Sequence, residues 1–229
     1  MSSPPHLLND DGSASMATMM MMSHHAFRRD LGRFARALER VASGDTTRVD
    51  ALREEWKNFH GALHGHHHME DTAIFPSMRP QNADLGSCID GLAADHKKLD
   101  PLLEEGDRAF AQLPTTGPAS AVVRELQSLL DPHLAIEEAQ LVPYLRPAKD
   151  FPAPPDDAMA EMYAQGFAWS SHGIAPEVLE QVYALLPPIL ASRMPAALAA
   201  FKARCEKVWG SAKAGSSRTP IPTADDATS

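Results

Sequence analysis

The chain has 229 residues, 44% of them hydrophobic, which is enough apolar material to bury one core and favours a single domain with an appendage. Its formal net charge of -9 disfavours nucleic acid and anionic membranes as partners, because both carry negative charge. The two cysteines lie far apart in the sequence, and no apolar stretch approaches the roughly 20 residues of a membrane span, so we expect no disulfide framework and a cytoplasmic protein.

Polar ends flank a helical middle. Residues 1–15 and 211–229 are rich in serine, proline or glycine, and we predict that both segments are disordered. Between them, apolar residues recur with helical spacing, and the spacing predicts four amphipathic helices that begin near Met16, Asp45, Gly86 and Pro118. Short connections make such helices pack antiparallel. The predicted fold is therefore all-α, an up-and-down antiparallel four-helix bundle over residues 16–147.

Residues 148–210 are predicted to form a C-terminal helical extension. A proline-rich stretch at 149–155 precedes two further helical segments at 158–165 and 176–208, the second interrupted by adjacent prolines. The apolar residues of this appendage need a surface to pack on. Either the bundle or a second subunit would serve, so assembly of a homo-oligomer through these helices is one of two open arrangements.

The second and fourth predicted helices carry the same motif. His66-x-x-x-Glu70 and His133-x-x-x-Glu137 are each followed directly by a second acid and, six residues after the glutamate, by a proline. A spacing of four residues places a histidine one helical turn from its glutamate on the same face. Each motif can therefore direct one nitrogen and one oxygen ligand at a common metal ion.

These motif residues fall in the apolar stripes of their helices, where a ligand in the core must lie. His96 holds the same position in the third helix. In the first helix, His24 shares a face with Leu31 and Leu38, whereas His25 does not. The up-and-down topology then brings six candidate metal ligands to one end of the bundle: His24, His66, Glu70, His96, His133 and Glu137.

A lone buried histidine is more often satisfied by hydrogen bonds than bound to a metal. Six converging candidates favour a metal, because two carboxylates in apolar stripes would be costly to bury unless paired or coordinated. Four imidazoles and two carboxylates exceed what one zinc needs and suit a pair of iron ions. The predicted cofactor is a di-iron centre of two Fe ions, and a structural zinc site is the least favoured alternative.

His24, His96 and the two His-x-x-x-Glu motifs resemble the haemerythrin, or HHE cation-binding, family over residues 16–147. The C-terminal helices resemble those of bacterial members with an extra helical region. The resemblance implies a four-helix bundle with a bridged di-iron centre that binds dioxygen or related small molecules. Oxygen-carrying members have a further histidine one turn from the third-helix ligand, where this chain has Leu92 and Asp100. Either one iron has fewer ligands, or Asp100 coordinates it.

Two functions follow from such a site. The first is binding of, or reaction with, dioxygen, hydrogen peroxide or nitric oxide, and the incomplete histidine set favours reactivity over dedicated transport. The alternative is a non-catalytic iron or oxygen sensor that signals through the C-terminal helices. Small diatomic molecules or peroxide are the expected partners, with neither nucleic acid nor membrane.

The remaining histidines of the second helix are predicted to lie outside the metal cluster. His60, His64 and His67 form a stripe of their own, turned away from His66 and Glu70, and a solvated stripe is favoured over a second metal site there. The consecutive methionines 19–22 point all around a helix and receive no ligand role. Pro132, directly before His133, is predicted to kink the fourth helix.

Overall fold

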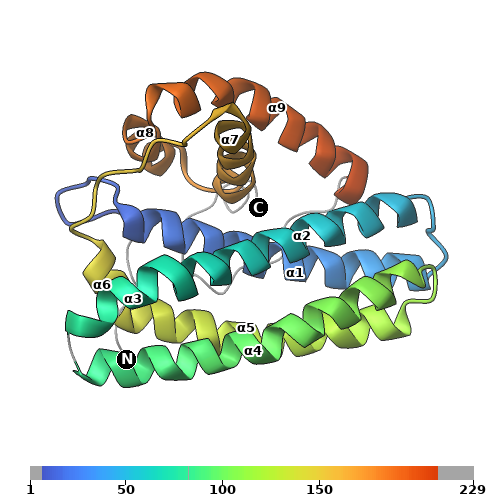
Figure 1. Ribbon diagram of the computed structural model, residues 1–229. Helices are drawn as coiled ribbons and strands as arrows, with labels where there is room; N and C mark the ends of the chain where they lie inside the picture. Colours follow the sequence, from blue (N-terminus) through green and yellow to red (C-terminus); the bar gives the residue numbers. More distant parts are fainter. Residues whose placement is uncertain (1–6, 82, 211–229) are drawn as a thin grey trace. The chain divides into compact units, whose positions relative to one another are not determined.

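The computed structural model describes residues 7–81 and 83–210, and no β-strand occurs among them (Figure 1). The all-α prediction is confirmed. The described residues divide into two compact units. One is Asp30–Gln140, and the other combines the residues up to Arg29 with those from Leu141 onward.

The unit Asp30–Gln140 is built from long helices that lie lengthwise beside one another (Figure 1). The helix α2 packs against α4, and α4 packs against α5. Contacts along α2 and α4 run in opposite directions, since Trp56 meets Asp107 whereas His67, further along α2, meets His96. These two helices are therefore antiparallel. In chain order, the elements are the second part of α1 (Met16–Ala42), α2 (Val49–Met69), the π-helix η1 (Glu70–Ile74), α3 (Phe75–Met78), the 3-10 helix η2 (Arg79–Gln81), α4 (Ala83–Ala111) and α5 (Gly117–Gln140).

A cluster of aromatic rings forms the core of this unit away from the histidines. Trp56 of α2 stacks on Phe110 of α4 with ring centroids 4.4 Å apart. Phe34 of α1 meets the rings of Trp56, Phe59 and Phe110 edge-on at 5.2 to 5.7 Å. Such edge-on and offset pairs are favourable beyond the area they bury. The cluster joins α1, α2 and α4 in one core.

Both His-x-x-x-Glu motifs end at a break in the α-helix. After Met69 the chain forms the π-helix η1, and α3 then begins with Pro76 in its first turn. After Gln140 the α5 helix ends, and α6 (Val142–Leu145) begins with Pro143 in its first turn. A proline lacks an N–H and its ring clashes with the carbonyl four residues earlier, so neither helix continues regularly through it. Pro132, by contrast, lies inside α5, and the helix does not end there.

The other unit contains the first part of α1, α6, and the C-terminal helices. The helix α7 (Asp157–Ser171) begins with Asp156, whose carboxylate accepts a hydrogen bond from the Met159 amide at 2.8 Å, as an N-cap does. A short helix α8 (Pro176–Ala184) leads to the long α9 (Pro188–Trp209), and α7 packs along α9. The two helical segments predicted for the appendage are thus present, and the second is interrupted just before Pro188.

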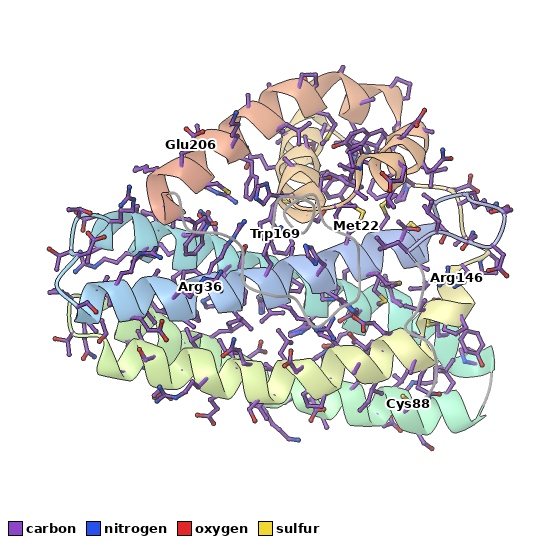
Figure 2. The ribbon with its side chains drawn as sticks, turned by 180° about the vertical axis from the view of Figure 1, so that it is seen from behind. Met22, Arg36, Cys88, Arg146, Trp169 and Glu206 are labelled. Atoms are coloured by element: carbon purple, nitrogen blue, oxygen red, sulfur yellow. The ribbon has the colours of Figure 1, made fainter. Side chains whose placement is uncertain are left out.

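Within this unit, α7 packs on the first part of α1. The ring of Phe27 lies 5.0 Å from that of Trp169, which is labelled in Figure 2. The buried guanidinium of Arg29 donates hydrogen bonds to the carbonyl oxygens of Trp169 and His172, at 3.1 and 2.8 Å. Trp169 lies in the last turn of α7, where its carbonyl also accepts the His172 amide at 3.4 Å, and His172 is the residue that follows the helix. The appendage therefore has a packing surface on α1 of the same chain.

Residues 7–15 make defined contacts, although the composition of residues 1–15 predicts disorder. Leu7 is buried, and its carbonyl accepts a hydrogen bond from the Thr18 hydroxyl at 2.8 Å. Asp11 accepts from the Ser13 amide at 2.9 Å and pairs with Lys149 at 2.9 Å. One buried leucine and these polar contacts hold a segment whose composition alone suggests disorder. Residues 1–6 and 211–229 lie outside the described residues.

Among residues 7–81 and 83–210, no helix is both long and apolar enough to cross a membrane.

Candidate metal centre

Four side chains in the unit Asp30–Gln140 form the first group that could hold a metal ion. Each offers one ligand atom, and these atoms all lie within 4.8 Å of one another. All four side chains are buried. They come from the end of α2, the start of η1, the middle of α4 and the last third of α5, and they are His67, Glu70, His96 and His133.

A second group shares a residue with the first. His66, Glu70 and Glu137 offer ligand atoms that also lie within 4.8 Å of one another. Glu70 directs its two oxygens at different histidines: Oε1 lies 3.2 Å from Nε2 of His66, and Oε2 lies 3.5 Å from Nε2 of His96. One carboxylate therefore faces both groups, which is the arrangement that a bridging ligand requires.

The spacing of the nitrogen and oxygen atoms fits a metal ion. The Nε2 atoms of His96 and His133 are 3.3 Å apart, and Nε2 of His133 is 3.2 Å from Oε1 of Glu137. Two ligand atoms bound to one ion at about 2.1 Å each lie about 3.0 to 3.4 Å from one another. Imidazole nitrogens and carboxylate oxygens are also the mixed ligands that first-row transition metals accept. The residues present therefore fit a metal site.

Two carboxylates outside the two groups lie near the outer ring nitrogens of histidines, and one of them, Asp71, makes a hydrogen bond. Nδ1 of His96 donates to Oδ1 of Asp71 at 3.0 Å, so Nε2 of the same ring is turned toward Glu70. Nδ1 of His133 lies 3.8 Å from Oδ2 of Asp95. Metal-binding histidines commonly hold their second nitrogen against a carboxylate in this way. Asp71 was not predicted, although it is the second acid of the His66 motif and the repeat could have suggested it.

Burial and the neighbouring carboxylates shift the pKa values of these histidines in different directions. Burial lowers the pKa of His66 to about 4, and it also lowers that of His96. Burial acts in the same direction on His133, but the hydrogen bond to Glu137 and the charges of Glu137 and Glu70 outweigh it and raise its pKa. His66 is therefore neutral near pH 7, which is the form that binds a metal ion.

Five of the six predicted ligands are thus near one another within one unit. The sixth, His24, lies on the first part of α1 in the other unit, and its place among the ligands stays a prediction. His24 and His25 are both buried, so the expectation that only His24 faces a core is wrong. The reason is that α7 covers a second face of α1, where Arg29 follows His25 by one turn.

The prediction that His67 lies outside the cluster is also wrong. Only 2% of His67 is exposed, and its ring stacks on that of His96 with centroids 4.1 Å apart. His60 and His64 do lie on the other side of α2, where they pair with Asp107 at 3.0 Å and Asp100 at 3.5 Å. Asp100 is half exposed and belongs to neither group of candidate ligands in the described part of the chain.

The comparisons with known proteins agree with this geometry. No curated protein and no solved structure matched the chain at a significant level. The family described as Hemerythrin HHE cation binding domain matches residues 15–145, which is more than half of the chain and contains every candidate ligand. The chain therefore belongs to the haemerythrin HHE cation-binding family.

Proposed function

We propose that the chain holds two iron ions, one in each group of ligands, and that the pair binds or reacts with a small oxidant or diatomic molecule. The observation that carries this proposal is the position of Glu70. Its two oxygens lie 3.2 and 3.5 Å from histidines of different groups, so a single carboxylate can contact two ions. A mononuclear zinc site would need neither the shared carboxylate nor so many imidazoles.

The burial of the site limits the size of the molecules that can bind to the irons. Glu70 and Glu137 are 0% exposed, and His133 is 1% exposed, so bulk water and large substrates do not reach the carboxylates. When bound, a pair of irons supplies two electrons and an open coordination position for dioxygen, hydrogen peroxide or nitric oxide. The protein supplies fixed nitrogens, two negative charges and a dry environment, in which charged interactions are stronger than in water.

Metal analysis of protein produced in iron-replete medium tests the proposal. We expect two irons per chain and an optical absorption in the near ultraviolet that iron-free protein lacks. One zinc per chain without that absorption would overturn the proposal. In Glu70→Gln, both ions should be lost together, because the variant removes a charged oxygen from each group. The matched control is Glu54→Gln on the preceding helix α2, since Glu54 is exposed and pairs with Lys57 at 2.8 Å.

Rapid mixing with hydrogen peroxide distinguishes the two functions of the iron pair. Dismutation converts two peroxide molecules into one dioxygen and two water molecules and needs no other reductant. Sustained release of dioxygen over many turnovers would show an enzyme. A single, stoichiometric spectral change would instead favour the sensor, in which the state of the iron is passed to the C-terminal helices.

A further inference from the structure

His67 is placed as a ligand would be, although it lies outside the His-x-x-x-Glu pattern. One of its ring nitrogens lies within 4.8 Å of the ligand atoms of Glu70, His96 and His133. Its ring stacks on that of His96 at 4.1 Å and meets that of His133 edge-on at 5.6 Å. The three rings come from three different helices, α2, α4 and α5. They converge on one oxygen ligand, the carboxylate of Glu70.

Helix geometry explains why both His66 and His67 face the site. Successive residues of an α-helix are rotated by about 100°, so His66 lies about 40° to one side of Glu70 and His67 about 60° to the other. With Glu70 pointing inward, each histidine flanks it. His66 then belongs to one group and His67 to the other.

The repeated motif shows that an imidazole is not needed at this position for packing. His67 follows His66 directly, and the equivalent residue after His133 is Leu134, which is fully buried. A leucine therefore satisfies the same position in the second motif. A buried imidazole costs more free energy to desolvate than a leucine, unless its nitrogens are used.

We propose that His67 is a metal ligand, and that it binds the same ion as His96 and His133, with Glu70 as the oxygen shared with the second ion. The inference rests on the proposed function, because it requires an ion in the first group. It replaces both alternatives left by the absent third-helix histidine, an iron with fewer ligands or coordination by Asp100. The additional nitrogen ligand is that of His67 on α2. The ion in the first group then has three imidazole ligands, from His67, His96 and His133.

The variant His67→Phe separates metal binding by His67 from stacking of its ring against His96. Phenylalanine retains an aromatic ring of similar size but has no nitrogen to donate. Anaerobic equilibrium dialysis with Fe(II) alone measures the number and affinity of the bound ions. We expect two ions in the wild-type protein, and in the variant a loss of affinity for one of them by about tenfold or more. Circular dichroism checks that the variant is folded.

A second variant tests the missing nitrogen directly. His67→Gly leaves a space where the ring was, and added imidazole should restore the lost ion in the same dialysis. The matched control is His68→Phe, because His68 is the neighbouring residue and is exposed. Unchanged binding of two ions by His67→Phe would overturn the assignment of His67 while leaving the proposed function intact. Failure of the wild-type protein to bind Fe(II) would overturn both.

Discussion

Asp71 accepts a hydrogen bond from Nδ1 of His96 at 3.0 Å, while Nε2 of the same ring lies 3.5 Å from Glu70. The carboxylate thus fixes which nitrogen of His96 faces the site. Asp71 itself is 41% exposed, so it contributes orientation and charge more than packing.

The first prediction follows from this pair. Asp71→Ala should weaken metal binding by about 10 to 100-fold without unfolding the protein, because His96 loses the partner that fixes its ring. Competition with a chromophoric chelator measures the affinity. Asp90→Ala is the control, since Asp90 lies on α4, is exposed and pairs with Arg79 instead. Equal affinities for the two variants would show that Asp71 does not orient a ligand.

The second prediction concerns the aromatic core. A Cβ atom added at Gly106 of α4 would overlap the six-membered ring of Trp56, which is buried and stacked on Phe110. Gly106→Ala should therefore lower the free energy of unfolding by about 1 to 3 kcal/mol, although alanine is the better helix former.

Gly91→Ala, on the same helix as Gly106, should instead raise the free energy of unfolding. Nothing lies within 4 Å of a Cβ atom built there, so the variant should gain about 0.5 to 1 kcal/mol from helix propensity. Urea denaturation of the three proteins measures both changes. A Gly106→Ala protein as stable as Gly91→Ala would mean that Trp56 does not occupy its observed position.

The third prediction concerns the C-terminal helices. Arg29→Met should destabilise the end of α7 by about 1 to 3 kcal/mol, because the carbonyls of Trp169 and His172 lose their hydrogen bonds from a buried guanidinium. Hydrogen exchange of the α7 amides should become faster. Arg193→Met is the comparison, since the ion pair of Arg193 with Asp157 is on the surface and should contribute little. Equal exchange rates in both variants would contradict the capping role.

The fourth prediction concerns the pH dependence of the metal-free protein. The pKa of His66 falls from 6.5 to about 4 on folding, because burial disfavours its charged form. The unfolded chain therefore binds a proton at a higher pH than the folded chain does. The contribution of His66 is complete above pH 6.5 and is lost as the pH falls toward about 4.

His66→Gln should consequently lose less stability than the wild-type protein over that pH range. The raised pKa of His133 acts in the opposite direction, but it is present in both proteins and largely cancels in the comparison. Thermal denaturation at a series of pH values in the presence of a chelator gives the two curves. Parallel curves would show that His66 is not buried in its neutral form.

The helical pattern is sufficient to predict the fold class, the approximate helix positions and the convergence of five candidate ligands. It fails for His67 because a step of three residues, from His67 to Glu70, also places two side chains on one helix face, as the step of four from His66 does. It fails for His25 because a stripe shows which face of a helix is the most apolar, and not how many faces other helices cover. The partner of Arg29, 140 residues away at Trp169, has no local sequence signal.

The helix breaks after the two motifs set the angular position of the residues that follow them. Each of the two helices that carry a His-x-x-x-Glu motif is α-helical up to or just past its glutamate and then changes its hydrogen bonding, at η1 in one case and at Leu141 in the other. A π-helical turn contains about one residue more than an α-helical turn. The turn η1 therefore rotates the side chains that follow it about the helix axis. Phe75 directly follows η1, and its ring stacks on that of His96 with centroids 5.6 Å apart. Deleting one residue from Glu70–Ile74 would rotate Phe75 by about 100° and separate the ligand cluster from the ring that covers it.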